Sequence, residues 1–122
     1  MKKLIIFCAA LLFSFGCNGE GDLPEVETSA VSVQGNTVTS GGIVHSEGAT
    51  GGQVHRRGVV WLEDGTRRPT IDRNIGRTSD GVGPGEFTST FEVDESGTYQ
   101  LRAYATNQRG TTYGAVEKFE ID

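Results

Sequence analysis

Along most of the chain after residue 24, apolar and polar residues alternate with a period of two. In residues 86–93, Phe87, Ser89, Phe91 and Val93 share one face of an extended strand, and the residues between them are polar. This alternation is typical of a strand with one buried face. Segments of this kind, bounded by turn residues at the spacing of a sandwich, are predicted at residues 25–33, 37–45, 53–63, near 69–72, 86–93, 99–107 and 113–121. The pattern therefore predicts an all-β sandwich of about seven strands.

Two of these segments carry apolar residues on both faces. In residues 53–63, Val59 and Trp61 share one face, and Val60 and Leu62 share the other. We therefore expect a central strand whose outer face is covered by a neighbouring side chain or loop. In residues 99–107, Tyr104 stands on the polar face, where its ring either covers an edge or is exposed for contact.

Composition narrows the class of protein. The chain has 122 residues, 18 of them glycine, and 35% hydrophobic residues. The length allows one small domain, and the glycines leave few stretches long enough for a helix. A net charge of −5 argues against a nucleic-acid partner, because such proteins are normally basic.

The N-terminus has the pattern of a secretory leader. Lys2 and Lys3 precede an apolar run of about a dozen residues, which is shorter than the ~20 that a spanning helix needs. The run ends in Ser14-Phe15-Gly16-Cys17, which resembles the lipobox of bacterial lipoproteins. The resemblance implies a signal peptide over 1–16, a lipidated Cys17 with a linker over 17–23, and a folded domain over 24–122. Ordinary secretion with a free thiol is the alternative.

The residues after the cysteine suggest a location. Asn18 stands where inner-membrane lipoproteins often have Asp, and Glu20 and Asp22 resemble the acidic tag that exports some lipoproteins to the cell surface. We therefore expect a lipid anchor in the outer membrane, held by more than one acyl chain. Facing the exterior is the favoured orientation.

Residues 93–107, Val-Asp-Glu-Ser-Gly-Thr-Tyr-Gln-Leu-Arg-Ala-Tyr-Ala-Thr-Asn, resemble the end of a fibronectin type III domain. The resemblance extends to the phrases at 40–44, 57–61, 85–91 and 110–114, and it implies an immunoglobulin-like sandwich. It also implies that the Tyr99 hydroxyl reaches back to a backbone group a few residues upstream, as a tyrosine corner. The chain departs from the family in having Glu95 where the turn usually has Pro, and in placing Trp61 in the apparent third strand.

Catalytic chemistry has little support. His45 and His55 are the two imidazoles of the chain, and no Gly-x-Ser-x-Gly elbow is present. The two histidines lack zinc-ligand spacing, and Cys17 would carry lipid. Residues 80–86 contain the acids and glycines of a calcium loop but not its alternating spacing, and a flexible connection is the simpler interpretation. We expect no enzyme, no metal and no cofactor.

The arginines are concentrated in one stretch of the chain. Six of the nine basic residues that follow the leader lie within 22 positions; they are Arg56, Arg57, Arg67, Arg68, Arg73 and Arg77. Arginine forks suit phosphate and sulfate groups, so a basic face for an anionic partner is one interpretation. The other is that arginine keeps edge strands soluble.

These observations predict a surface lipoprotein whose sandwich is a non-catalytic binding or adhesion module for a protein or an anionic glycan. The fold alone leaves this function open, because many functions share it. A structural or accessory lipoprotein, packed into a larger envelope assembly, is the alternative.

Overall fold

A computed structural model describes residues 22–49 and 52–122 of the chain. The predicted signal peptide and Cys17 lie outside the described residues. The described residues contain nine β-strands, joined by turns and loops: β1 (Glu25–Thr28), β2 (Ser32–Gln34), β3 (Thr37–Ser46), β4 (Arg56–Glu63), β5 (Gly76–Arg77), β6 (Gly85–Glu92), β7 (Gly97–Asn107), β8 (Gly110–Tyr113) and β9 (Glu117–Ile121). No helix in this part of the chain is long and apolar enough to cross a membrane.

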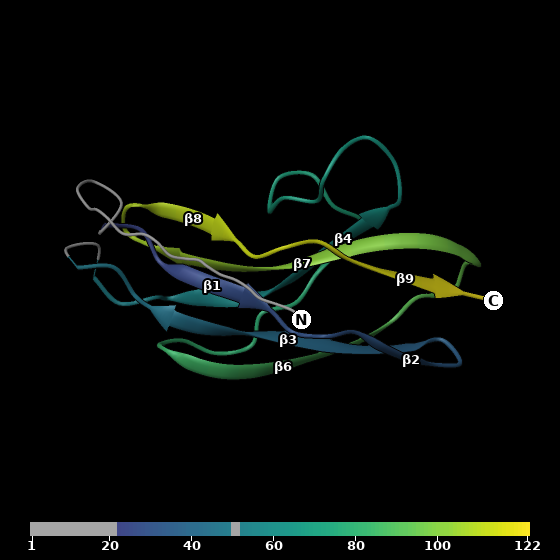
Figure 1. Ribbon diagram of the computed structural model, residues 1–122, viewed down its shortest axis with the longest axis horizontal. Coiled ribbons are helices and arrows are strands. Elements are labelled where there is room, and N and C mark those ends of the chain that lie inside the picture. The colour runs from purple at the N-terminus through teal and green to yellow at the C-terminus, as the bar shows by residue number, and fades with distance from the viewer. Residues whose placement is uncertain (1–21, 50–51) are drawn as a thin grey trace, which may run out of the picture.

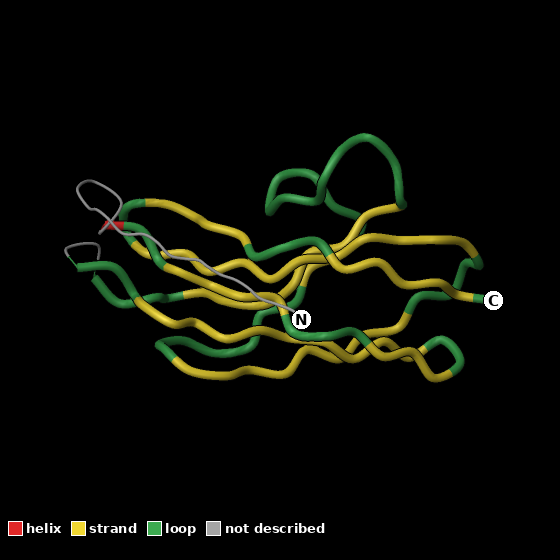
Figure 2. The backbone as a smooth tube through the Cα atoms, viewed as in Figure 1, coloured by secondary structure: helices red, strands yellow, loops and turns green. Residues whose placement is uncertain are grey.

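The strands form two antiparallel sheets that pack face to face (Figures 1 and 2). In the first sheet, β3 is central: β6 pairs along one side of it, and β1 and β2 pair one after the other along its other side. In the second sheet the order is β5, β4, β7, and then β8 and β9 share the far side of β7. The architecture is a β-sandwich, as the sequence predicts. Its nine strands occupy seven positions across the two sheets, because β1 and β2 share one edge position and β8 and β9 share another.

The core lies between the sheets and is built from the predicted inward positions. Phe87 and Ser89 of β6 are buried, and so are Leu101 and Ala103 of β7. Trp61 of β4 stacks on Phe91 with ring centroids 3.6 Å apart. Burying such apolar side chains provides the main driving force for folding in a domain of this size.

The fourth predicted strand is wrong in position. Residues 69–72 form a turn, closed by a two-residue bridge between Thr70 and Arg73, and the strand lies later, at Gly76–Arg77. Packing explains the choice of Gly76, because a Cβ atom there would lie 2.0 Å from the Trp61 ring. Glycine is normally unfavourable in a strand, but here it makes room for the central aromatic residue.

Tyr99, at the start of the central strand β7, fastens the turn before it. Its side chain is 3% exposed, and its hydroxyl donates a 2.7 Å hydrogen bond to the carbonyl of Glu95, four residues upstream. The ring stacks on Phe119 at a centroid distance of 5.2 Å. The backbone bond expected from the sequence is therefore present. Burial and the charges of Glu95 and Glu63 raise the pKa of the Tyr99 phenol.

Candidate anion-binding face

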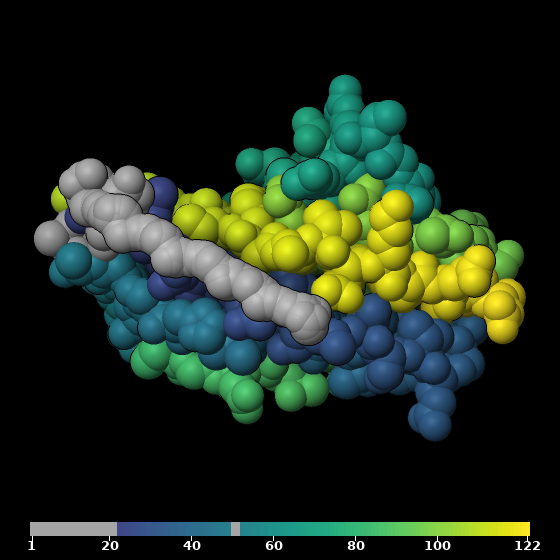
Figure 3. Space-filling model, viewed as in Figure 1, coloured from purple at the N-terminus to yellow at the C-terminus, as the bar shows by residue number. Residues whose placement is uncertain are grey.

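The outer face of the five-stranded sheet is largely covered. Residues that alternate with the core positions of β7 point outward, and two of them, Gln100 and Tyr104, are 3% and 0% exposed. Val60, on the outer face of β4, is also fully buried. The expected cover over β4 is therefore present. It comes from the loop of residues 64–75, called the covering loop below, which rises as a ridge above β7 and β8 (Figure 3).

Outward side chains of β7 hold the covering loop by its backbone. The Gln100 amide donates to the carbonyl of Arg67, and the Arg102 Nε donates to the carbonyl of Pro69 at 2.8 Å. Pro69 is itself fully buried. Since a buried loop must satisfy its own polar backbone groups, these donors allow the loop to lie on the sheet.

A tight turn makes the tip of the loop rigid. Thr70 and Arg73 exchange two backbone hydrogen bonds of 2.8 and 3.1 Å, and the Thr70 hydroxyl accepts a third from the Arg73 N–H. The Asn74 amide donates to the carbonyls of Thr70 and Ile71. The Ile71 N–H donates to the Tyr113 hydroxyl at 3.0 Å, which ties the tip to β8.

Tyr104 is buried, so it is not an exposed contact residue, and its hydroxyl reaches the segment that follows the edge strand β5. Its hydroxyl donates to the Thr78 carbonyl at 2.6 Å. The opposite residue on β4 is Gly58, where a Cβ would lie 2.3 Å from that same carbonyl oxygen. Burial raises the pKa of the Tyr104 phenol, while the nearby Arg77 and Arg56 charges lower it.

Strand register brings Arg77, one of the predicted arginines, to this face together with Arg102, which was not predicted. Arg77 of β5 and Arg102 of β7 both pair with Val60, so the three residues form one row across the outer face. The Arg102 guanidinium lies 4.1 Å from the centroid of the Tyr113 ring. Burial lowers the pKa of Arg102; the neighbouring Tyr113 acts in the opposite direction, and the Arg68 charge lowers the pKa further.

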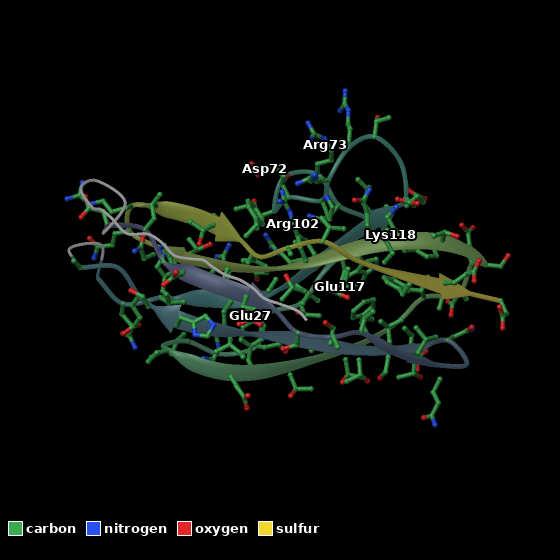
Figure 4. The ribbon with its side chains drawn as sticks, viewed as in Figure 1. Glu27, Asp72, Arg73, Arg102, Glu117 and Lys118 are labelled. Atoms are coloured by element: carbon green, nitrogen blue, oxygen red, sulfur yellow. The ribbon has the colours of Figure 1, made fainter. Side chains whose placement is uncertain are left out.

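Five of the six predicted arginines lie on this side of the sandwich. Arg67, Arg68 and Arg73 are exposed on the covering loop, and Arg56 and Arg77 lie at exposed positions on the sheet below it. Figure 4 shows Arg73 and Arg102 on the same side of β7, with Asp72 beside them. Together with Arg102, these residues form the arginine face.

Arg57 belongs elsewhere. It pairs with the buried Ala105, so it points toward the core side of β4. There its guanidinium donates to the carbonyls of Asp80, Gly83 and Pro84 at 2.9 to 3.0 Å and lies 5.2 Å from the centroid of the Phe87 ring. Arg57 therefore ties the connection before β6 to the sandwich and is not available to a ligand.

The arginine face carries no carboxylate partners of its own. The ion pairs between described residues are His45 with Glu27 at 2.7 Å and Lys118 with Asp64 at 3.4 Å, and neither involves an arginine. In contrast, the outer face of the four-stranded sheet carries acids: Glu27 and Glu86 flank Ile43 in one row. The arginine face and these two glutamates thus lie on opposite faces of the sandwich.

The connection at residues 80–86 does not gather cation ligands. The Asp80 carboxylate accepts a hydrogen bond from the buried Ser89 hydroxyl, and the Gly83 N–H donates to the Val54 carbonyl. Within residues 22–49 and 52–122, no group of three or more His, Cys, Asp or Glu side chains could hold a metal ion. His45 is held by Glu27 on the outer face of the four-stranded sheet.

Comparison with models of protein families, with curated proteins and with solved structures gave no match to this chain.

Proposed function

We propose that this chain is a lipid-anchored, non-catalytic binding module whose arginine face binds an anionic glycan or an acidic protein surface. Cys17 carries the anchor, and the outer membrane is its location, with the domain facing the cell exterior. The sandwich is of the fibronectin type III kind.

Strand order and one hydrogen bond support this fold type. Three strand rows in one sheet face four in the other, and the chain passes between the sheets three times: from β3 to β4, from β5 to β6 and from β6 to β7. Tyr99 stands at the start of a central strand with its hydroxyl on an upstream carbonyl, which is the arrangement of a tyrosine corner.

The observation that carries the binding proposal is the set of unpaired guanidinium groups on one side of the molecule. Arg67, Arg68 and Arg73 project from a loop whose backbone is fixed by bonds from the sheet, so the cations are presented on a rigid support. Fixed presentation lowers the entropy lost on binding. Arginine forks then make paired hydrogen bonds with sulfate, phosphate or carboxylate groups.

The test uses a sulfated polysaccharide as the probe. The purified chain should bind it at low salt, and binding should weaken steeply as salt rises, because exposed charges are screened over ~8 Å at physiological ionic strength. Replacing Arg67 and Arg68 with glutamine should weaken binding and reduce its salt dependence. Thermal stability should stay nearly unchanged, since exposed charges contribute only about 0–1 kcal/mol per pair.

Arg109 provides the matched control. It is an exposed arginine at the β7–β8 turn, at the end of the sandwich, so Arg109→Gln makes the same substitution, with the same charge change per residue, outside the arginine face. If the control weakened binding as much per charge as the loop variant, net charge rather than the face would explain the effect. If the probe did not bind at low salt, the arginines would be left with the role of keeping the β5 edge soluble.

A further inference from the structure

One edge of β6 is unpaired in the described sandwich, and a groove lies beside the end of that edge. β6 (Gly85–Glu92) pairs with β3 along one side. Among the described residues, no backbone hydrogen bond reaches its other side. Alternate N–H and C=O groups of this eight-residue strand therefore point outward, which is the template that an added strand requires.

A groove of about 220 Å³ opens beside the end of this edge, between the two sheets. Its apolar lining comes from Trp61, Ile75, Val93 and Tyr99. The groove exists because β5 is only two residues long: the Ile75 N–H still donates to the Trp61 carbonyl, but the preceding residues leave the sheet for the covering loop. Ile75 is 50% exposed as a result.

The rim of the groove is acidic. Glu92, Asp94 and Glu95 line it, all three are exposed, and none pairs with a cation among the described residues. No lysine or arginine lines the groove. An apolar floor with a negative rim suits a lysine or arginine side chain, whose aliphatic stem packs on apolar surface while its charged end stays near solvent.

We propose that β6 is the docking edge for an extended, basic segment of a partner protein. The segment adds as a further strand to the four-stranded sheet and places a lysine or arginine side chain in the groove. Main-chain hydrogen bonds to β6 would supply affinity, and the groove would supply specificity. This docking edge is separate from the arginine face and does not depend on it.

Charge distinguishes this partner from a second copy of the chain. If two β6 strands paired about a twofold axis at Ser89, Glu86 of each copy would lie opposite Glu92 of the other. Like charges directly opposite on adjacent strands are destabilising. A basic segment would instead bring cations to the same two glutamates.

The probe is a labelled eight-residue peptide that alternates valine with threonine and carries lysine at both ends. Binding to the purified full chain is followed by fluorescence anisotropy. Two N-methylated versions each block the amide donors on one edge of the peptide. Because only one edge of an added strand faces β6, one of these peptides should lose binding and the other should retain it. Equal binding by both would overturn strand addition.

Variants of the chain test the groove. Glu92→Gln with Asp94→Asn should weaken peptide binding by up to roughly thirtyfold, the effect of two exposed charge contacts at the upper end of their range. Glu120→Gln, at an exposed position of β9, is the control and should leave it unchanged. A second peptide, with glutamate in place of lysine, should bind the parent chain weakly. Its affinity should be no higher than that of the lysine peptide for the double variant.

Other outcomes would overturn the proposal. No binding of the lysine peptide up to millimolar concentration would exclude a docking edge of this specificity. Sedimentation could instead show a concentration-dependent dimer that N-methylated peptides disrupt equally well with or without their lysines. That result would assign the edge to a second copy of the chain.

Discussion

Removal of the Tyr99 hydroxyl tests the tie between the β6–β7 turn and the sandwich. In Tyr99→Phe the ring keeps its stacking on Phe119, so the perturbation is confined to the 2.7 Å hydrogen bond to the Glu95 carbonyl. A typical intramolecular hydrogen bond contributes about 0.5–1.5 kcal/mol net. Glu95 is exposed, so its released carbonyl can bind water and no large further penalty arises.

We therefore expect the variant to lose about 1 kcal/mol of stability, which for a domain of ~100 residues lowers Tm by about 4–8 °C. Urea unfolding measures the loss, and the slope m should not change, because the same surface is exposed on unfolding. Glu95→Ala is the matched control: it removes the side chain but keeps the carbonyl acceptor, so its midpoint should stay close to that of the parent.

Two results would refute this reasoning. A midpoint for Tyr99→Phe equal to that of the parent would mean that the bond contributes nothing, and the turn would have to be held by packing alone. If Glu95→Ala lost about as much stability as Tyr99→Phe, the Glu95 side chain, rather than its carbonyl, would be holding the turn.

Burial raises the pKa of both Tyr99 and Tyr104, so the native state binds their protons more tightly than the unfolded state does. The contribution of these two tyrosines to the free energy of unfolding should be constant below about pH 10 and should fall as pH rises above it, by up to ~1.4 kcal/mol per pH unit for each tyrosine. Replacing both with phenylalanine should flatten that fall, as measured by urea titrations at each pH. Gly76→Ala should cost roughly 1–3 kcal/mol in the same assay, because the new Cβ would overlap the tryptophan ring, whereas Gly65→Ala, which meets nothing within 4 Å, should be nearly neutral. Cys17→Ser should release the chain from membranes or leave it unprocessed. Retention of a fully processed serine variant in the membrane fraction would contradict lipidation.

Period-two patterning was sufficient to predict the four long strands β3, β4, β6 and β7, because each has one face in the common core, but it misplaced the two-residue strand β5. The same alternation placed Trp61 and Leu101 correctly on the inner face. It could not show that the outer face of β7 is also covered, since Gln100 is polar and reads as a solvated position. In the structure Gln100 is buried, and its amide bonds to the carbonyls of Glu63 at the end of β4 and of Arg67 in the covering loop, both more than 30 residues away in the chain.

The arginine face shows a similar limit. A count along the chain finds the stretch that contains Arg67 and Arg68 but also includes Arg57, whose strand position turns it toward the core side. It excludes Arg102, which reaches the same face through pairing of β7 with β4. Sequence proximity predicts where charge is dense, whereas strand register decides which charges share a surface.

The way in which the covering loop is attached has a consequence for how the protein can change. Gln100 and Arg102 hold the loop by its main-chain carbonyls, which every amino acid possesses. Substitutions at Arg67, Arg68 or Arg73 would therefore leave the attachment intact. Under the proposed function, the three loop arginines are therefore separate from the bonds that hold the loop, so relatives of this domain could acquire new ligands by exchanging these loop side chains. Randomising the three positions offers a compact library for engineering a binder on an unaltered scaffold.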